Sequence, residues 1–344
     1  MSSSVAFDPL ELTEHASLNQ VVVQSGPNAI RGRQAEEICS RNALVGLAAE
    51  HGLISIRPHH VADDLADATF SGDTEIRRAA EAVVTGFGHR LGALIATLRT
   101  TRDVATASTE HQGFLSHWFT VDRVWLAGGL LASQCGPRIA EAAAAMTVNA
   151  ERPCPVVLAP RPGLAPLLGA ARLASPVGDG VVLAIADLGH TSVRTALVRR
   201  RSSVVDELAL VDVVDAGSHG SAEDVADSLA DVLGRVVHRA SKAGAAVHLT
   251  VSVAAHVVRG RPLDGQGRYG WMARGARSLV TRLSANCPLE LTVQFVHDGT
   301  ASAAAVGSLN SATITVGTWL GVGFVPDVAS HLLDLAPELR VTRD

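Results

Sequence analysis

The chain has 344 residues, enough for two domains that each bury a core of their own. Its net charge is −5 at neutral pH, and no block of lysine or arginine indicates nucleic acid or an anionic membrane as a partner. No apolar run is long enough to span a bilayer, the N-terminal segment lacks a signal-peptide core, and the 4 cysteines are scattered. We therefore expect a cytoplasmic protein with reduced thiols.

The first half of the chain predicts helices that alternate with short strands. Apolar residues recur at helical spacing over 35–54 and 74–100, with an interruption expected near Gly86 and Gly88. Residues 101–117 are rich in Ser and Thr and indicate a loop or a short insertion. The remaining expected elements are a strand at 123–129, a helix at 137–150, a strand at 155–160 and a helix at 163–174.

The second half begins after a turn-like joint at 175–180. A strand starts at 181, and a hairpin covers 192–214. The elements expected after it are a helix at 221–241, a strand at 246–254, a helix at 271–285, a strand at 291–297 and a hairpin at 312–325. This alternation of strands and helices is typical of an α/β fold.

The first polar motif ends the strand that starts at 181 and reads Asp187-Leu-Gly189-His190-Thr191. Gly189 permits a close backbone approach to phosphate oxygens, and Thr191 offers a hydroxyl to them. Asp187 is able to hold a water-coordinated magnesium ion. The alternative interpretation is an ordinary hairpin with a polar turn, which short motifs taken singly favour.

Asp298 stands between an apolar strand and a helix of small residues, directly after His297. A carboxylate at a strand end can accept the proton of a substrate hydroxyl during phosphoryl transfer. Asp is also a favoured N-cap residue, so Asp298 serves either as general base or as helix cap.

Two glycine-rich segments remain. Gly317-Thr318-Trp319-Leu-Gly321-Val322-Gly323 is either a hairpin whose backbone meets phosphates or a plain hairpin with a glycine bulge. Gly128-Gly129 follows a hydrophobic strand and allows the backbone to approach an adenosine, although this signal is weak by itself.

In their joint order these motifs resemble the ROK family of sugar kinases, repressors and open reading frames, within the actin–hexokinase–heat-shock ATPase superfamily. Segments 181–198, 295–307 and 314–324 resemble the parts with which such chains begin, whereas 32–44, 121–133 and 166–175 resemble the C-terminal half. The resemblance implies a two-lobed, actin-like (ribonuclease H-like) α/β fold that is circularly permuted. We expect residues 1–158 and 306–344 in one lobe and 159–305 in the other.

The resemblance implies that Asp298 is the base and that Asp187 organises magnesium. It also implies that 189–191 and 317–323 contact the ATP phosphates and that Gly128-Gly129 borders adenosine. His190, Trp319 and Val322 stand where the family has glycine, and His297 stands where it has an asparagine that binds a sugar hydroxyl. A left-handed glycine position is costly for tryptophan, so either this loop differs or position 319 never needed a positive φ.

The substrate region matches the family least. Glu36 falls where a sugar-binding glutamate is expected, and an exposed glutamate in the first helical turn is an equally good interpretation. Arg259 and Asp264 lie in a Gly-rich loop that either reads substrate or is simply solvated. The family's three zinc cysteines are absent, so we expect no zinc site.

The expected function is phosphorylation by ATP, with Mg²⁺, of a hydroxyl on a sugar or sugar-like metabolite, such as a modified sugar, an amino sugar or a cyclitol. The alternative is a catalytically degenerate ROK-like protein that acts as a metabolite sensor or an interaction module. The repressors of the family carry an N-terminal DNA-binding segment that has no counterpart here, so we expect no direct DNA binding and no membrane partner. A homodimer is the family's habit.

Overall fold

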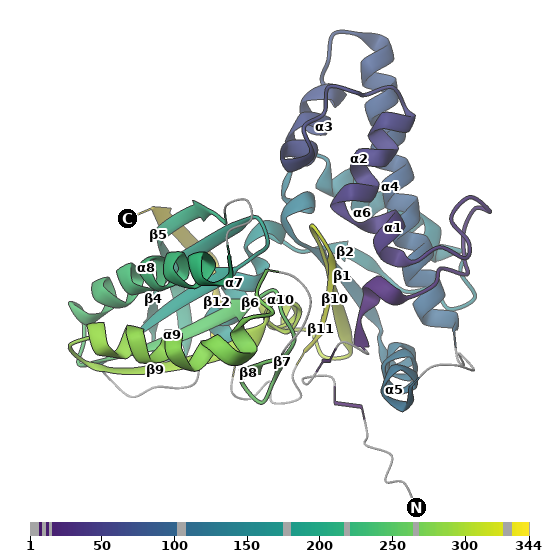
Figure 1. Cartoon of the computed structure of the whole chain (residues 1–344). Helices are drawn as coiled ribbons and strands as arrows, with labels where there is room; N and C mark the ends of the chain where they lie inside the picture. Colours follow the sequence, from purple (N-terminus) through teal and green to yellow (C-terminus); the bar gives the residue numbers. More distant parts are fainter. Residues whose placement is uncertain are drawn as a thin grey trace, which may run out of the picture. The chain divides into compact units, whose positions relative to one another are not determined.

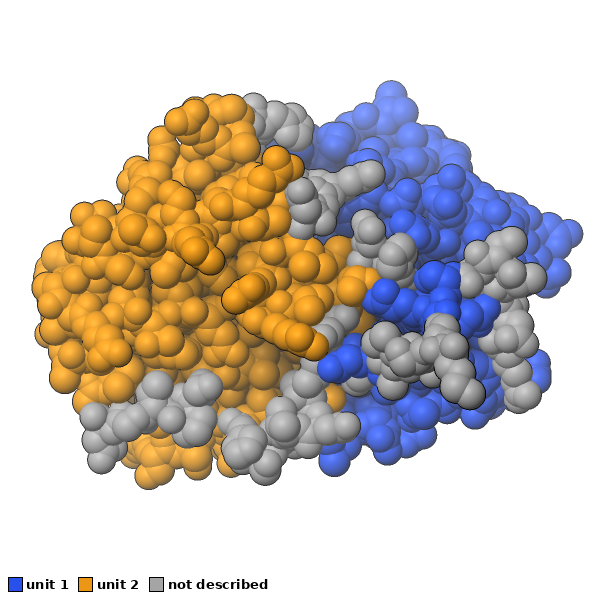
Figure 2. All heavy atoms as spheres, turned by 60° about the horizontal axis from the view of Figure 1, so that its bottom comes forward, with its two compact units in different colours: residues 1–9, 15–165, 308–324 blue, residues 10–14, 166–307, 325–344 orange. Residues whose placement is uncertain are grey.

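The computed structural model describes residues 7–8, 12–13, 16–101, 108–174, 180–216, 221–263, 268–325 and 332–343. The chain divides into two compact units, which Figure 2 colours separately. Unit 1 comprises residues 1–9, 15–165 and 308–324, and unit 2 comprises residues 10–14, 166–307 and 325–344. The expected mixed α/β fold with parallel strands is confirmed. No helix in the described ranges has the length and apolar character needed to cross a membrane.

Unit 1 combines a helical layer with a small sheet (Figure 1). Its helices are α1 (Ala35–Cys39), α2 (Arg41–Glu50), α3 (Val61–Thr69), α4 (Thr74–Thr100), α5 (Thr109–His117) and α6 (Gly136–Val148). Its strands are β1 (Arg123–Ala127), β2 (Val156–Leu158), β10 (Ser311–Val316) and β11 (Leu320–Phe324). β10 lies between β11, its antiparallel hairpin partner, and β1, to which it is parallel; β2 extends the sheet beyond β1.

Three expectations about unit 1 differ from the structure. The helix expected at 35–54 is broken at Ser40, whose hydroxyl accepts from the Ala43 N–H and caps α2. The interruption expected near Gly88 is absent, because α4 runs unbroken. A Cβ on Gly88 would lie 2.5 Å from the Ile139 carbonyl of α6, so this glycine allows two helices to pack closely. The expected loop at 101–117 contains α5, which Ser108 caps.

Unit 2 is built on a six-stranded sheet in the order β12-β5-β4-β3-β6-β9. Its strands are β3 (Val181–Leu188), β4 (Ser192–Arg201), β5 (Val204–Asp215), β6 (Ala246–Val253), β9 (Glu290–His297) and β12 (Asp334–Arg343), with the small hairpin β7 (Val257–Val258) and β8 (Arg261–Pro262) beside them. Its helices are α7 (Ala165–Leu173), α8 (Ala222–Ser241), α9 (Met272–Asn286) and α10 (Asp298–Val306). β3, β6 and β9 are parallel, and β3, β4 and β5 form an antiparallel meander.

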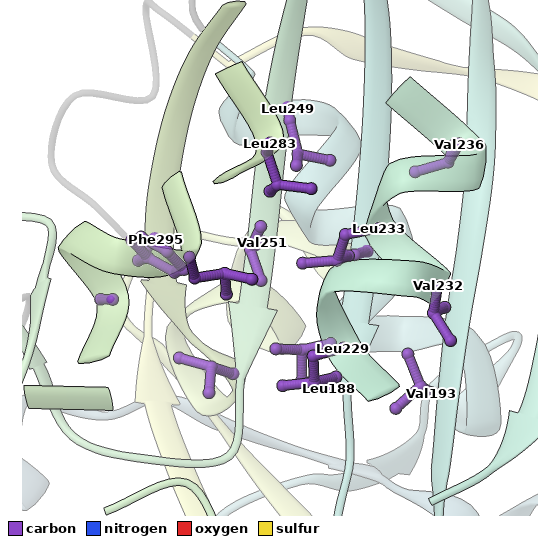
Figure 3. Close-up of a cluster of buried hydrophobic side chains, with 14 of the residues drawn as sticks. Leu188, Val193, Leu229, Val232, Leu233, Val236, Leu249, Val251, Leu283 and Phe295 are labelled. Carbon is purple, nitrogen blue, oxygen red and sulfur yellow. The ribbon is translucent and has the colours of Figure 1, made fainter. Parts of the chain in front are cut away.

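One face of this sheet packs against α8 and α9 (Figures 1 and 3). Side chains that point to this face alternate along the strands, as Leu249 and Val251 do on β6, because the side-chain period of a strand is two. They meet the apolar stripe of α8, which includes Leu229 and Leu233. The same alternation sends Asp187 to the opposite face from its neighbour Leu188.

Helices α7 and α10 contact each other at a single glycine. A Cβ on Gly169 would stand 1.5 Å from the Ala301 carbonyl oxygen, so only glycine fits there. Arg172 then joins three elements, since its guanidinium donates to the Ala304 carbonyl at the end of α10 and to the Leu333 carbonyl before β12.

The C-terminal strand differs from the expected division of the chain. Residues 325–344, expected in the lobe of residues 1–158, belong instead to unit 2, where β12 pairs in parallel with β5. The buried Glu207 on β5 explains this placement, because its carboxylate accepts from Arg340 at 2.9 Å and from the Thr342 hydroxyl at 2.9 Å. The expected joint at 175–180 falls almost entirely outside the described residues.

The two sheets share a pattern of strand pairing. In unit 2, β3 pairs with its hairpin partner β4 on one side and with the parallel strand β6 on the other, and β6 pairs in turn with the parallel strand β9. In unit 1, β10 pairs with β11 on one side and with the parallel strand β1 on the other, and β1 pairs in turn with the parallel strand β2. The chain order differs, since the hairpin comes first in unit 2 and last in unit 1.

Candidate active site

Two carboxylates lie at one edge of the sheet of unit 2. Asp187 is the penultimate residue of β3, and Asp298 directly follows β9. Because β3, β6 and β9 are parallel, their carboxyl ends meet at the same edge, which is where ligands bind in sheets of this kind. The structure thus brings together two residues that are 111 positions apart in the chain (298 − 187).

Asp187 is a buried acid with one basic partner. Its carboxylate Oδ2 accepts from Arg194 Nη1 at 3.2 Å, and Arg194 is its cross-strand neighbour on β4. Burial raises the pKa of Asp187 to about 7; the Arg194 charge opposes this rise, and the nearby charge of Asp298 adds to it. Arg194 therefore holds the Asp187 carboxylate in place, and the pKa of Asp187 changes with any further charge that comes close to it.

Asp298 is the more accessible of the two acids. Its side chain is 21% exposed, against 4% for Asp187, so small molecules in solution have more access to it. One carboxylate oxygen accepts from the Gly299 N–H at 2.8 Å and lies 3.3 Å from His297 Nε2. Burial raises its pKa, while the charges of His190 and His256 oppose the rise. The cap position of α10 is held by His297, and Asp298 is the first residue inside the helix, so the N-cap interpretation of Asp298 is wrong.

Three histidines surround Asp298. His297 is buried, and its pKa falls to about 4 because burial disfavours the charged ring. The His256 ring, which follows β6, stacks on the His297 ring with 5.9 Å between centroids and 9° between planes. His190 comes from the turn after β3, and its ring lies 6.2 Å from that of Tyr269.

The turn after β3 is fixed by hydrogen bonds on both sides. The Gly189 N–H donates to the Ser192 carbonyl at 3.1 Å, so it closes the tight turn that the sequence predicts here. The Tyr269 hydroxyl donates to the Gly189 carbonyl at 2.9 Å, and the Ala216 N–H donates to the Thr191 carbonyl. The Thr191 side chain is exposed.

Unit 1 holds the second set of predicted residues. Gly317 and Thr318 form the turn between β10 and β11, while Gly321 and Gly323 lie within β11 and pair with Thr315 and Thr313. Trp319 is 48% exposed and does not have a positive φ, so this position does not need glycine.

The glycine pair after β1 lies against the same hairpin. Gly128 has φ +106, and a Cβ there would stand 2.4 Å from the Val316 carbonyl oxygen. Gly129 has open space around it. The Arg41 N–H at the start of α2 donates to the Gly317 carbonyl at 2.9 Å. The two glycine-rich segments of the sequence and the start of α2 therefore meet within unit 1.

The predicted substrate residues other than His297 lie on separate elements or outside the described residues. Glu36 lies in the first turn of α1, as one interpretation of the sequence has it, but it is half-buried rather than exposed. Arg259 is exposed at the tip of the β7–β8 hairpin, where it and Gly260 both have positive φ, as a two-residue hairpin turn requires. Asp264 lies outside the described residues.

Asp187 and Asp298 are the two carboxylates at this edge that could take part in holding a cation. Within the described ranges, no group of three or more His, Cys, Asp or Glu is placed to hold a metal ion. Magnesium commonly keeps several waters and uses one or two carboxylates together with substrate phosphates. Asp187 and Asp298 repel each other electrostatically, and a cation between them would relieve that repulsion.

Sequence reasoning missed Arg194, His256 and Tyr269. Arg194 could have been predicted, because a hairpin that turns at 189–191 pairs position 187 with position 194. His256 lies three residues beyond the end of β6, near the edge that holds both acids, and Tyr269 is the only tyrosine of the chain. Their convergence depends on loop geometry that residue spacing does not encode.

Comparison with known proteins gives limited similarity. No protein-family model matches the sequence, and no curated protein sequence is similar to it. Among solved structures, T. thermophilus RuvC in complex with a Holliday junction substrate has 16% identity over 33% of this chain and 65% of that chain, with a TM-score of 0.23. A Thermus thermophilus RuvC structure has 15% identity over 33% and 63%, with a TM-score of 0.23. The ROK hexokinase from Thermus thermophilus has 20% identity over 44% and 48%, with a TM-score of 0.27. The chain thus spans less than two thirds of the length of each of these structures.

Proposed function

We propose that this protein is an ATP-dependent phosphotransferase that phosphorylates a hydroxyl of a sugar or sugar-like metabolite. The observation that carries the proposal is the pair Asp187 and Asp298 at the carboxyl ends of parallel strands, beside the turn at 189–191. One acid is buried and tied to an arginine, and the other is accessible. Two acids in such different environments are suited to different roles.

Asp298 acts as the general base in this proposal. In its ionised form it accepts the proton of the substrate hydroxyl at the carboxylate oxygen that is not committed to Gly299. His297 and Gly299 keep the carboxylate in place, and the charges of His190 and His256 favour its ionised form. ATP bound with magnesium supplies the phosphoryl group, and Asp187 is the residue that would hold the hydrated ion.

The shared strand pairing of the two sheets supports a circularly permuted, actin-like architecture. Unit 1 has the hairpin and the two parallel strands of unit 2, but its parallel strands precede its hairpin in the chain. Joining the end of β11 to the helices that precede β1 and cutting the chain before β3 would give both units the same order. This pattern and the sequence motifs together support the proposed ROK-type architecture.

A degenerate scaffold is the second candidate, and two observations favour it. The Arg194 guanidinium occupies the Asp187 carboxylate to which magnesium would be attracted. Trp319 is exposed on the hairpin that is expected to meet phosphates.

Calorimetric titration of the protein with ATP, with and without Mg²⁺, separates the two candidates. A working nucleotide site predicts magnesium-dependent binding that is lost in Asp187→Ala and kept in Asp206→Ala. Asp206 is a matched control, because it is an acid on β5 that pairs with Arg201 at 3.0 Å. Failure of the wild-type protein to bind ATP at millimolar concentration would reject the phosphotransferase and leave the sensor.

A further inference from the structure

The turn that follows β3 is held through two of its carbonyl groups. The Thr191 carbonyl accepts from the Ala216 N–H at 3.0 Å, which is a contact between main-chain atoms. The Gly189 carbonyl accepts from the Tyr269 hydroxyl at 2.9 Å, which is a contact from a side chain. A main-chain contact is open to almost any residue, whereas the second contact needs a side chain with a hydroxyl at the right reach. The hold of Tyr269 on Gly189 is therefore specific to this sequence.

Tyr269 is itself fixed in the core of unit 2. It is 1% exposed and packs among the residues that join the sheet to α8 and α9. Its own carbonyl accepts from the Met272 N–H at the start of α9 at 3.0 Å. Burial raises the pKa of its hydroxyl by more than the neighbouring Arg268 lowers it, so the hydroxyl keeps its proton and is a donor at neutral pH. Tyr269 is thus a fixed point against which the turn is set.

The contact with Gly189 sets the direction of the next N–H group. The Gly189 carbonyl and the His190 N–H belong to one peptide group, which is trans, and these two bonds point in opposite directions in a planar trans peptide. Because the Tyr269 hydroxyl holds the carbonyl, the N–H is directed away from Tyr269. Glycine accepts most backbone conformations, so Gly189 alone would let this peptide rotate. The Tyr269 hydroxyl selects one of its orientations.

The same turn lies beside the candidate base. The charge of His190 acts on Asp298, where it opposes the rise in pKa that burial causes, and the rings of His190 and Tyr269 are 6.2 Å apart. The resemblance to the ROK family implies that residues 189–191 contact the ATP phosphates. Backbone N–H groups of a turn bind anions when they are held in one direction. The orientation of the peptide between Gly189 and His190 therefore bears directly on nucleotide binding.

We propose that Tyr269 is a positioning residue, whose hydroxyl holds the Gly189–His190 peptide in the orientation in which its N–H binds a phosphate oxygen of the nucleotide. Tyr269 does not touch the nucleotide itself. Without the hydroxyl the peptide rotates, and the N–H is presented for only part of the time. The apparent affinity for the nucleotide falls by the same fraction. This inference rests on the proposed function for the identity of the ligand.

The hold on the turn is tested in the absence of any ligand. Tyr269→Phe keeps the ring and removes only the hydroxyl. The matched control is Thr281→Val on α9, because Thr281 also donates its hydroxyl to a carbonyl, that of Arg277, at 2.9 Å. The reporter is the Gly189 amide, which donates to the Ser192 carbonyl.

We expect the Gly189 amide to exchange its hydrogen about tenfold faster in Tyr269→Phe than in wild type, since one hydrogen bond of ordinary net strength is worth about that factor. In Thr281→Val it should exchange at the wild-type rate. An unchanged rate in Tyr269→Phe, or the same acceleration in both variants, would overturn the proposal.

The effect on the nucleotide is tested by calorimetric titration with ATP and Mg²⁺. The chain has 1 tyrosine, so growth on 3-fluorotyrosine changes residue 269 alone and keeps its hydroxyl. We expect the fluorinated protein to bind ATP like wild type, and Tyr269→Phe to bind it about five- to tenfold more weakly. The single fluorine resonance should move when ATP and Mg²⁺ are added. Equal affinities of Tyr269→Phe and wild type would overturn the role of the hydroxyl.

Failure of this inference and failure of the proposed function give different results. If the proposed function is wrong, wild type itself does not bind ATP, and the phosphate contact is overturned whatever the exchange rates. If only the role of Tyr269 is wrong, wild type binds ATP and Tyr269→Phe binds it as tightly.

Discussion

Replacing Asp187 with asparagine should stabilise unit 2 in a pH-dependent way. Asp187 has a pKa of 3.8 in the unfolded chain and about 7 in the folded one, so the folded state binds its proton more tightly. The contribution of Asp187 to stability is therefore fully present below pH 3.8 and is lost as the pH rises to 7. The loss reaches about 4 kcal/mol, since each pKa unit is worth about 1.4 kcal/mol.

Asparagine removes the titration and keeps the shape of the side chain. The variant also leaves Arg194 without its carboxylate, and this cost is nearly independent of pH because an arginine stays charged throughout. The change with pH is therefore the diagnostic quantity. Between pH 5 and pH 8, the stability of Asp187→Asn relative to wild type should rise by about 2–3 kcal/mol.

Hydrogen exchange at the amides of β3 and β6 measures this difference, because it reports the opening of unit 2 even if the two units unfold separately. The matched control is Asp206→Asn, which removes a half-buried acid of β5 that is also paired with an arginine. If the opening free energies of Asp187→Asn and wild type differ by the same amount at pH 5 and at pH 8, the claim that residue 187 is a buried, ionisable carboxylate is refuted.

Three further changes have defined outcomes. His297 has a pKa of about 4 in the folded protein, below its ordinary 6.5, so its contribution to stability is present above pH 6.5 and is lost as the pH falls to 4. The loss of unfolding free energy between neutral pH and pH 4 should therefore be smaller in His297→Gln than in wild type, by up to about 3 kcal/mol in urea unfolding. Gly169→Ala should lower the thermal midpoint strongly because of the 1.5 Å clash, whereas Gly234→Ala, with open space around its Cβ in α8, should raise stability by about 0.5–1 kcal/mol. Arg172→Met should cost about 2–4 kcal/mol by leaving two carbonyls without their donor, and unchanged hydrogen exchange in β12 would contradict that.

The sequence allowed much of the fold to be predicted where apolar periodicity is strong. The strand that ends at Leu188, directly after Asp187, and the amphipathic helix α8 lie close to their expected bounds, because alternation and helical spacing are local properties. The helix interruption expected near Gly88 is wrong. Glycine is needed there because a Cβ would clash with α6, a separate part of the chain. The sequence did not predict β12, because Glu207, whose carboxylate accepts from Arg340 on this strand, is distant in sequence.

The candidate site was predictable only in part. Asp187 and Asp298 lie at the ends of apolar strands, and strand ends are visible in a sequence. The roles of Arg194 and His256 depend on which loops meet at that edge. The turn after β3 shows the limit, since only its geometry reveals that the Gly189 N–H donates to the Ser192 carbonyl.

The most direct test of the proposed function is phosphoryl transfer itself. The wild-type protein and Asp298→Asn are each incubated with Mg²⁺, ATP and a panel of sugars, amino sugars and cyclitols, and ³¹P NMR follows the appearance of a phosphate ester. We predict an ester with at least one member of the panel, and a rate lower by about 10²–10⁴ in Asp298→Asn, with ATP still bound. Ester formation at an equal rate in Asp298→Asn, or no ester with any member of the panel, would contradict the assignment of Asp298 as the base of a sugar kinase.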